Sequence, residues 1–266
     1  MTFTLTPGTA PLLVSMPHTG TDIPAGLRGD YVPRALAVED ADWHLAHLYN
    51  CLPALGASVL RPRNARYVID LNRPPDDAPM YPGAANTELC PTRFFNGDPL
   101  YREGRAPSAE ERQRRLEQYW RPYHQALRGE LDRIKAAHGF VLLWDAHSIR
   151  SEIPWLFEGV LPDLNIGTAG GASAHASITQ AVADATASHG RVSHVVNGRF
   201  KGGYITRHYG DPAHDVHAVQ LEMCQSLYMQ EQPPYAYRED LARGVQPVLA
   251  GMAEAALAAC KALYGR

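Results

Sequence analysis

Short apolar runs alternate with longer amphipathic stretches along this chain, and the alternation predicts strands separated by helices. Apolar runs bounded by Pro, Gly or polar residues are typical of strands and occur at 11–16 (PLLVSM), 57–60, 67–71, 140–145 (FVLLWD), 193–196 and 217–223. Apolar residues at helical spacing predict helices over 40–55, 108–138, 173–188 and 243–264. Strands that alternate with helices favour an α/β fold with a mostly parallel sheet covered on both faces.

The longest predicted helix carries its own start and stop signals. Ser108 and Glu111 have the spacing of a capping box, and Gly139 is a typical residue just past a helix end. Pro122 should kink or split the helix because it lacks a backbone N–H. The preceding segment, 74–105, is rich in Pro, Gly, Asn and Asp, and a loop of this length is usually functional.

Composition narrows the class of protein. With 266 residues, 45% of them hydrophobic, and no linker-like or repeated segment, we expect a single domain over 1–266. The net charge of −3 is spread over interspersed acidic and basic residues, which argues against a nucleic-acid partner. We expect no membrane partner, because no apolar run is long enough to cross a bilayer and the N-terminus has no signal-peptide pattern. The four cysteines form no C-x-x-C pair, so we expect reduced thiols and a cytoplasmic protein.

Two histidines follow apolar strands and mark the candidate site. His18 comes after 11–16 and His147 after 140–145, and functional groups gather beyond the carboxyl ends of strands in such sheets. A catalytic zinc needs three protein ligands and one open position, so a carboxylate is expected as the third ligand. Asp22, Glu39, Asp40 and Asp42 are the alternatives; we favour Asp42, on the turn expected to face the site, although acids also stabilise a helix start. Asp145 points to the same side of its strand as His147 and is a candidate partner for a histidine.

Three further groups of residues suggest binding and catalysis. Asn72 and Arg73 follow the strand predicted at 67–71, and a guanidinium binds a carboxylate bidentately; Arg66 adds a second positive charge. The segment 202–210 (GGYITRHYG) has the composition of a binding loop or of an ordinary glycine-rich turn. Glu222 lies within an apolar strand, where a carboxylate is costly unless it is paired or functional.

These segments resemble one known family. SMPHTG, YVIDLNRPPDD, LLWDAHSIRS, VVNGRFKGGYITRHYG and AVQLEMCQSLYM are similar to segments of the N-formylglutamate deformylase (N-formylglutamate amidohydrolase) family, over about residues 11–229. The resemblance implies zinc-dependent hydrolysis of N-formyl-L-glutamate to formate and L-glutamate, in histidine degradation.

A more distant likeness is to zinc carboxypeptidases and aspartoacylase, and it implies an α/β/α sandwich around a mixed sheet. Those families share four features in a fixed chain order: a His at a strand end, an Asn-Arg pair, a second His at a strand end, and a Glu in a late strand. This chain has His18, Asn72-Arg73, His147 and Glu222 in the same order. The carboxypeptidase motif has a Glu three residues after its first His, where this chain has Thr21. The carboxylate ligand therefore cannot be carried over from that motif.

Together these features define the expected site. We expect Zn²⁺ at His18, Asp42 and His147 and Glu222 as the general base. Two carboxylate clamps would select a small dicarboxylate, one made of Arg66, Asn72 and Arg73 and the other of Tyr204 and Arg207. Two alternatives stay open: a zinc hydrolase of another N-acyl amino acid or short peptide, and a non-catalytic metal-binding protein. The sequence makes no prediction of oligomeric state.

Overall fold

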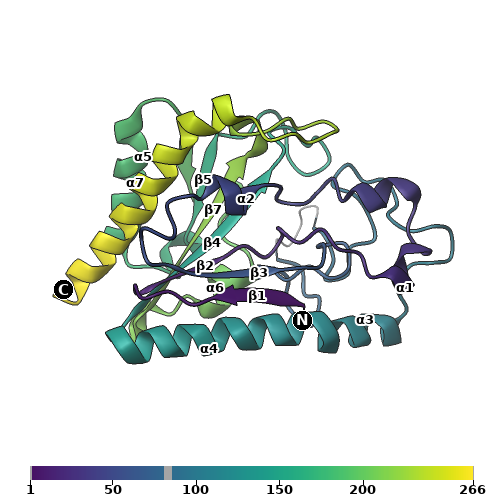
Figure 1. Ribbon diagram of the computed structural model, residues 1–266, viewed down its shortest axis with the longest axis horizontal. Helices are drawn as coiled ribbons and strands as arrows, with labels where there is room; N and C mark the ends of the chain where they lie inside the picture. The colour runs from purple at the N-terminus through teal and green to yellow at the C-terminus, as the bar shows by residue number, and fades with distance from the viewer. Residues whose placement is uncertain (1, 81–85, 266) are drawn as a thin grey trace.

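A seven-stranded sheet forms the middle layer of the molecule (Figure 1). The computed structural model describes residues 2–80 and 86–265. The strands are β1 (Phe3–Thr6), β2 (Leu12–Ser15), β3 (Ser58–Pro62), β4 (Val141–Ile149), β5 (Leu164–Gly167), β6 (His194–Val196) and β7 (Val216–Cys224). The helices are α1 (Ala25–Arg28), α2 (Leu45–Leu48), α3 (Ala109–Arg115), α4 (Arg121–His138), α5 (Ala176–His189), α6 (Tyr204–Tyr209) and α7 (Glu239–Leu263). Short 3₁₀ turns lie at Pro33–Ala37, Ala169–Gly171, Pro212–His214 and Gln225–Leu227.

The sheet is mostly parallel, as the sequence predicts. Its order is β1-β3-β2-β4-β7-β5-β6, with β3, β2, β4 and β7 parallel at the centre. β1 is antiparallel to β3, and β5 is antiparallel to β7 while it pairs in parallel with β6. The carboxyl ends of the four central strands therefore meet at one edge.

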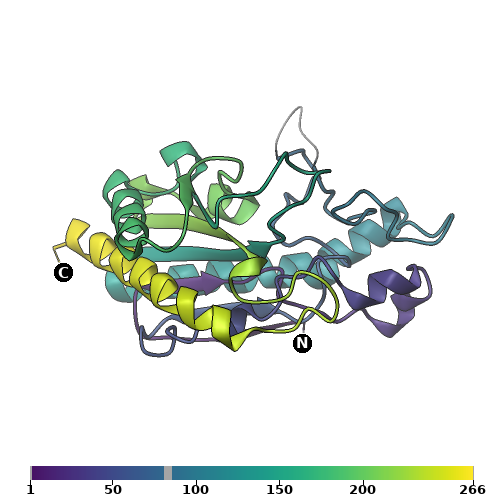
Figure 2. The same ribbon diagram turned by 90° about the horizontal axis from the view of Figure 1, so that it is seen from above.

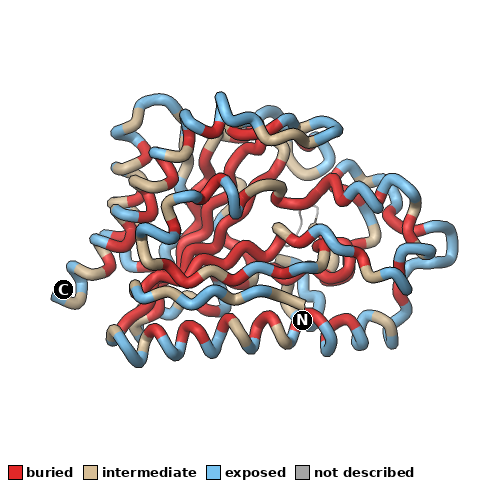
Figure 3. Tube along the Cα trace, in the orientation of Figure 1, coloured by how far each residue is buried: buried red, intermediate tan, exposed pale blue. Residues whose placement is uncertain are grey.

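Helices cover both faces of the sheet, which confirms the α/β/α sandwich. Figure 1 shows α4 along one face and α5 with α7 on the other. Leu142 and Trp144 of β4 belong to the core under α5 and α7, while Val141 and Leu143 belong to the core under α4. The central strands are buried on both faces (Figure 3), as parallel strands usually are. Because side chains alternate, Asp145 and His147 lie on the α4 face of β4.

The helical region that starts at Ser108 follows its sequence signals closely. The Ser108 hydroxyl accepts a hydrogen bond from the Glu111 N–H at 3.2 Å, and Gly139 ends α4 with φ of 83°. A π-helical turn, Leu116–Trp120, separates α3 from α4, and Pro122 stands in the first turn of α4. The backbone stays helical from α3 through this turn into α4, and Pro122, which lacks the N–H of a regular helix, directly follows the π-helical turn.

Two predicted elements are wrong for the same physical reason. The segment 40–55 contains only the short α2, because the backbone around Asp42 makes tertiary hydrogen bonds in place of helical ones. The Asp42 N–H donates to the His18 carbonyl, and the carbonyls on either side of Asp42 accept from Gln225 and Tyr228. The segment 67–71 is not a strand but a buried turn. Its carbonyls accept from side chains: Tyr67 from Tyr31, Val68 from Arg115 and Leu71 from His124.

Short elements were missed, and one end of the molecule is built from loops. β1, β5 and α6 have between 4 and 6 residues each and give weak periodic signals. Figure 2 shows α1 and α3 at the end of the molecule opposite the C-terminus. A bridge between Tyr31 and Tyr101 joins the segment after α1 to the segment before α3.

Within the described part of the chain, no helix combines the length and the apolar character that crossing a membrane requires.

His124 makes a testable link between α4 and the turn that precedes the site. Its Nε2 donates to the Leu71 carbonyl at 2.9 Å, and its Nδ1 lies 3.0 Å from the Tyr209 hydroxyl, so the ring is held neutral. Burial lowers the pKa of His124 from 6.5 to about 3. Below pH 6.5 this histidine is protonated in the unfolded chain, whereas in the folded chain it stays neutral down to about pH 3. The free energy of unfolding therefore decreases as the pH falls from 6.5 to about 3.

We predict that His124→Gln removes this part of the acid sensitivity. Between pH 7.5 and pH 5 the unchanged protein should lose about 2 kcal/mol more unfolding free energy than the variant. Urea unfolding at both pH values, with a chelator present, measures the difference. Identical losses in the two proteins would show that His124 is not held neutral by burial.

Candidate active site

Three potential metal ligands meet at the carboxyl edge of the sheet. His18 follows β2, Asp42 lies in the irregular segment before α2, and His147 is within β4. Nδ1 of His18 and Nδ1 of His147 face each other at 3.2 Å, and Oδ2 of Asp42 lies 3.8 Å and 3.3 Å from them. The three side chains are buried, and their ligand atoms all lie within 4.8 Å of one another.

Each imidazole has a carboxylate on its other side. His18 Nε2 is hydrogen-bonded to Asp70 Oδ1 at 2.7 Å, and His147 Nε2 lies 3.2 Å from Asp145 Oδ1. At His18 this hydrogen bond holds the ring proton on Nε2 and leaves Nδ1 as the ligand atom, as in many metal sites. At His147 it is the placement of Nδ1, which faces Nδ1 of His18 and Oδ2 of Asp42, that makes this nitrogen the ligand atom. The sequence-based expectation that Asp145 and His147 share a face agrees with the contact between them.

Asn72 connects this arrangement to α6. Its Oδ1 accepts from the Ile205 N–H at 2.8 Å, which identifies its Nδ2 as the donor group. That Nδ2 lies 3.2 Å from Asp145 Oδ2 and 2.9 Å from His147 Nε2. Asn72 therefore fixes both the carboxylate and the imidazole against the first turn of α6.

The electrostatics of the two histidines differ. Burial and the charge of Arg66 lower the pKa of His18. Burial alone would also lower the pKa of His147, but the Asp145 carboxylate outweighs it and raises that pKa well above its usual value. The pKa of Asp70 is held well below its usual value, since His18 and Arg66 overcome the opposing effect of burial. Two nitrogens that face each other at 3.2 Å cannot both carry a proton, because two N–H groups would point at each other.

The residues fit a divalent cation. Oδ2 of Asp42 is buried and has no hydrogen-bond partner among the described residues, although a buried carboxylate oxygen normally has one. Two imidazole nitrogens and one carboxylate oxygen form a donor set typical of catalytic zinc, which keeps a fourth position open.

The other three acidic alternatives lie elsewhere. Asp22 is exposed, Glu39 pairs with Arg34 at 2.6 Å, and Asp40 accepts from Tyr67 and from the Phe95 N–H. Asp42 is thus the member of the four that the fold brings to both histidines.

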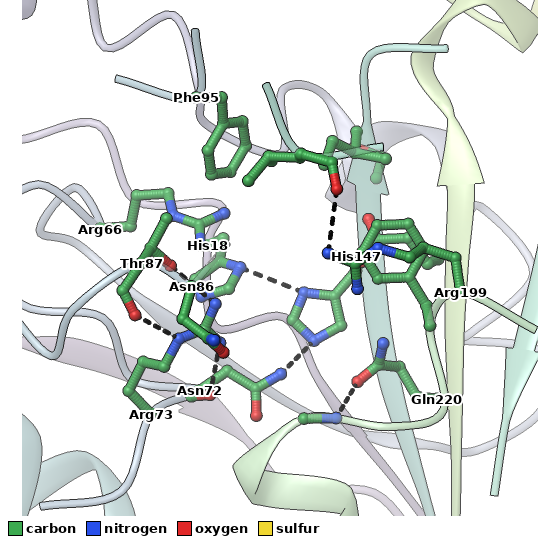
Figure 4. A pocket seen from close by; sticks show the side chains of 16 residues that line it. His18, Arg66, Asn72, Arg73, Asn86, Thr87, Phe95, His147, Arg199 and Gln220 are labelled. Atoms are coloured by element: carbon green, nitrogen blue, oxygen red, sulfur yellow. Dashed lines mark hydrogen bonds between the residues drawn. The ribbon is translucent and has the colours of Figure 1, made fainter. Parts of the chain in front are cut away.

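Glu222 faces the same pocket from β7. It is the register partner of His147, and Gln220 is the partner of Asp145, so all four side chains occupy one face of two paired strands. Burial raises the pKa of Glu222 to about 8. Figure 4 shows the pocket that Glu222 lines together with His18 and His147.

Positively charged and amide side chains form the pocket walls. Arg66, Asn72 and Arg73 line it, as the sequence-based clamp requires. The Arg66 guanidinium donates to Asp70 Oδ2 at 2.6 Å, and Arg73 donates to the carbonyl and hydroxyl oxygens of Thr87 at 3.0 Å and 2.7 Å.

The second predicted clamp has a different placement. Tyr204 and Arg207 are not among the described residues that line the pocket. Residues 204–209 form a helix, and Tyr204 stacks on His208 at 4.8 Å, while Arg207 is exposed and donates from Nε to the Gly202 carbonyl.

Arg199 and Gln220 line the pocket, and neither was predicted. For Gln220 a signal existed, because it stands two residues before Glu222 and therefore shares its face of the strand. Arg199 lies in an irregular segment after β6, where no periodicity points to it.

Comparisons with known proteins agree on one family. The family model described as N-formylglutamate amidohydrolase matches residues 10–229. N-formylglutamate deformylases from Pseudomonas putida and Pseudomonas aeruginosa PAO1 are 54% and 52% identical to this chain over 251 residues, 94% of each chain. A crystal structure of N-formylglutamate amidohydrolase from Ralstonia eutropha JMP134 superposes with a TM-score of 0.80 at 26% identity, covering 96% of this chain and 97% of that one.

Gly203 offers a test of the packing around Asn72. A Cβ at this position would overlap the Asn72 amide, which is held by hydrogen bonds and cannot move freely. We predict that Gly203→Ala lowers the free energy of unfolding by about 1–3 kcal/mol, the usual cost of overpacking. Chemical denaturation measures this change.

The matched control is Gly244→Ala in α7, where an added Cβ meets nothing within 4 Å. Alanine is the better helix former, so this variant should gain up to about 1 kcal/mol. Equal effects of the two substitutions would contradict the close contact between Gly203 and Asn72.

Proposed function

The chain belongs to the N-formylglutamate amidohydrolase family, and on that basis we propose that it hydrolyses N-formyl-L-glutamate to formate and L-glutamate in a zinc-dependent reaction. The main support is the convergence of two Nδ1 atoms and an unpartnered carboxylate oxygen, within the described residues, beside a buried glutamate. An arginine-lined pocket at the same place suits an anionic substrate. The family also supports a place in histidine degradation, as the step that releases glutamate.

Under this proposal His18, Asp42 and His147 hold the metal. A zinc ion bound there supplies a Lewis acid that lowers the pKa of water and stabilises negative charge on the formyl oxygen. Asp70 and Asp145 keep the two rings oriented through their Nε2 atoms.

Glu222 carries the proton in the proposed reaction. It accepts a proton from the attacking water as the new C–O bond forms at the formyl carbon. It then returns the proton to the departing nitrogen as the C–N bond breaks, which yields formic acid and the free amine. Transfer of the acid's proton to the amine gives formate and the ammonium form of glutamate. Burial raises the pKa of Glu222 in the metal-free site, and the charge of a cation bound beside it would act against that shift. The carboxylate form, which accepts the proton of water, would then be available near neutral pH.

Arg66 and the Asn72-Arg73 pair are proposed to bind the substrate beside the reacting bond. Arg66 is buried among charged groups of the site, and its charge affects both His18 and Glu222. Arg73 uses hydrogen bonds to Thr87 and to the Asn72 carbonyl to hold its guanidinium against the pocket. A carboxylate next to the scissile amide would bind here.

Metal removal tests the cofactor. Chelated protein should lose hydrolysis of N-formyl-L-glutamate and regain it when about one Zn²⁺ per chain is restored. Loss of a residue that only orients a metal ligand weakens metal binding by roughly 10–100-fold. Loss of a ligand itself should weaken zinc binding by more than this in each of the three variants His18→Ala, Asp42→Ala and His147→Ala. Calorimetric titration measures this affinity.

Asp22→Ala is the control, since its exposed carboxylate lies outside the cluster and the variant should bind zinc normally. Full turnover by metal-free protein would contradict the proposed cofactor. Zinc binding without turnover of any N-acyl amino acid would favour the alternative of a non-catalytic metal-binding protein. Turnover measured with a panel of N-acyl amino acids shows whether N-formyl-L-glutamate or another N-acyl amino acid is the preferred substrate.

Replacement of Glu222 tests the proton carrier. Glu222→Gln retains the shape of the side chain but cannot take up a proton, so kcat should fall by about 10²–10⁴-fold while zinc affinity is preserved. Steady-state kinetics together with metal analysis check both halves. A variant that keeps kcat within a few-fold of the original would remove Glu222 from this role.

A further inference from the structure

The pocket has a second polar wall that the proposed reaction does not use. Arg199 and Gln220 lie on one side of His147 in Figure 4, while Arg66, Asn72 and Arg73 lie on the other. A substrate with two carboxylates needs two binding regions, and the first wall accounts for only one.

Gln220 presents a defined donor group to this space. The residue is only 3% exposed and lines the pocket. Its Oε1 accepts from the Gly203 N–H at 2.7 Å, so its Nε2 must be the amide nitrogen, and no hydrogen bond of that nitrogen is found within the described residues. A buried amide donor that reaches a pocket is suited to a ligand acceptor.

Arg199 supplies the charge on the same wall. Its Nη2 donates to the Leu156 carbonyl at 3.2 Å, and its guanidinium lies 5.3 Å from the centre of the Phe200 ring. Leu156 and Phe200 also line the pocket. The arginine is therefore fixed to the pocket wall by its surroundings, and a planar guanidinium can bind a carboxylate through two hydrogen bonds.

The two walls differ in their relation to the reacting groups. The charge of Arg66 acts directly on His18 and Glu222, and Asn72, next to Arg73, contacts His147. The main charges acting on Glu222 are His147, Asp42, Arg66 and Asp145, and Arg199 is not one of them. The first wall thus suits the carboxylate on the carbon that bears the scissile nitrogen, and the Arg199 wall suits a group further along the substrate.

We propose that Arg199 and the Nε2 of Gln220 bind the side-chain carboxylate of the substrate and thereby determine selectivity for glutamate over glutamine derivatives. This inference rests on the proposed N-formylglutamate hydrolysis and concerns a second subsite of the same pocket. A side-chain carboxamide has one acceptor oxygen where a carboxylate has two, so its NH₂ group would face one of these donors and leave it without an acceptor, and a polar site rejects such an analogue strongly.

The test compares kcat/KM for N-formyl-L-glutamate with that for N-formyl-L-glutamine. Arg199→Gln should reduce the ratio of the two values by about 10- to 100-fold, the equivalent of hydrogen bonds to a charged group. Gln220→Glu keeps an acceptor for the Gly203 N–H and replaces the donor with a carboxylate oxygen, so it should reduce the ratio similarly. The ratio cancels any general effect of either change on catalysis or folding.

Arg191→Gln is the matched control, because Arg191 is an exposed arginine outside the pocket and its loss should leave the ratio unchanged. Equal losses for both substrates in Arg199→Gln and Gln220→Glu would overturn the inference. So would a change of ratio in Arg207→Gln but not in Arg199→Gln. Failure of the unchanged protein to hydrolyse N-formyl-L-glutamate would instead refute the proposed function, so the two failures are distinguishable.

Discussion

The arrangement of the site depends on one constraint: three Lewis bases lie close together in the protein interior. Nδ1 of His18, Nδ1 of His147 and Oδ2 of Asp42 lie within 4.8 Å of one another, and all three side chains are buried. Electron pairs brought together in a low-dielectric interior repel one another and are costly to bury without a proton or a cation between them. A protein that keeps this arrangement must hold it with other interactions, and the surrounding residues provide them.

Those interactions come from every layer of the fold. Strands β4 and β7 set His147 and Glu222 side by side through their register. The turn before Arg73 brings Asp70 to His18 and Asn72 to His147. The segment that carries Asp42 is fixed by the His18 carbonyl and by Gln225 and Tyr228, which follow β7. Each irregular segment near the site thus exchanges regular backbone pairing for contacts that orient a functional side chain.

The sequence predicts the parts of this arrangement that local pattern controls. The long apolar runs of β2, β4 and β7 and the capping signals of Ser108 and Gly139 are visible without any tertiary information, and the histidines follow from their place beside those runs. The region around Asp42 was predicted to be helical, because its apolar spacing is helical while its hydrogen-bond partners are distant in the chain. Choosing Asp42 over Asp22, Glu39 and Asp40 likewise depends on which loop folds back to His18, and Arg199 is brought to the pocket by packing that no periodicity encodes.

The most direct measurement is a crystal structure of the zinc-loaded protein with anomalous data collected at the zinc edge. We predict one strong peak per chain, about 2.0–2.2 Å from Nδ1 of His18, Nδ1 of His147 and a carboxylate oxygen of Asp42, with Glu222 beside it as a non-ligand. A peak bound through the Nε2 atoms, a site that omits Asp42, or no peak at this edge of the sheet would contradict it.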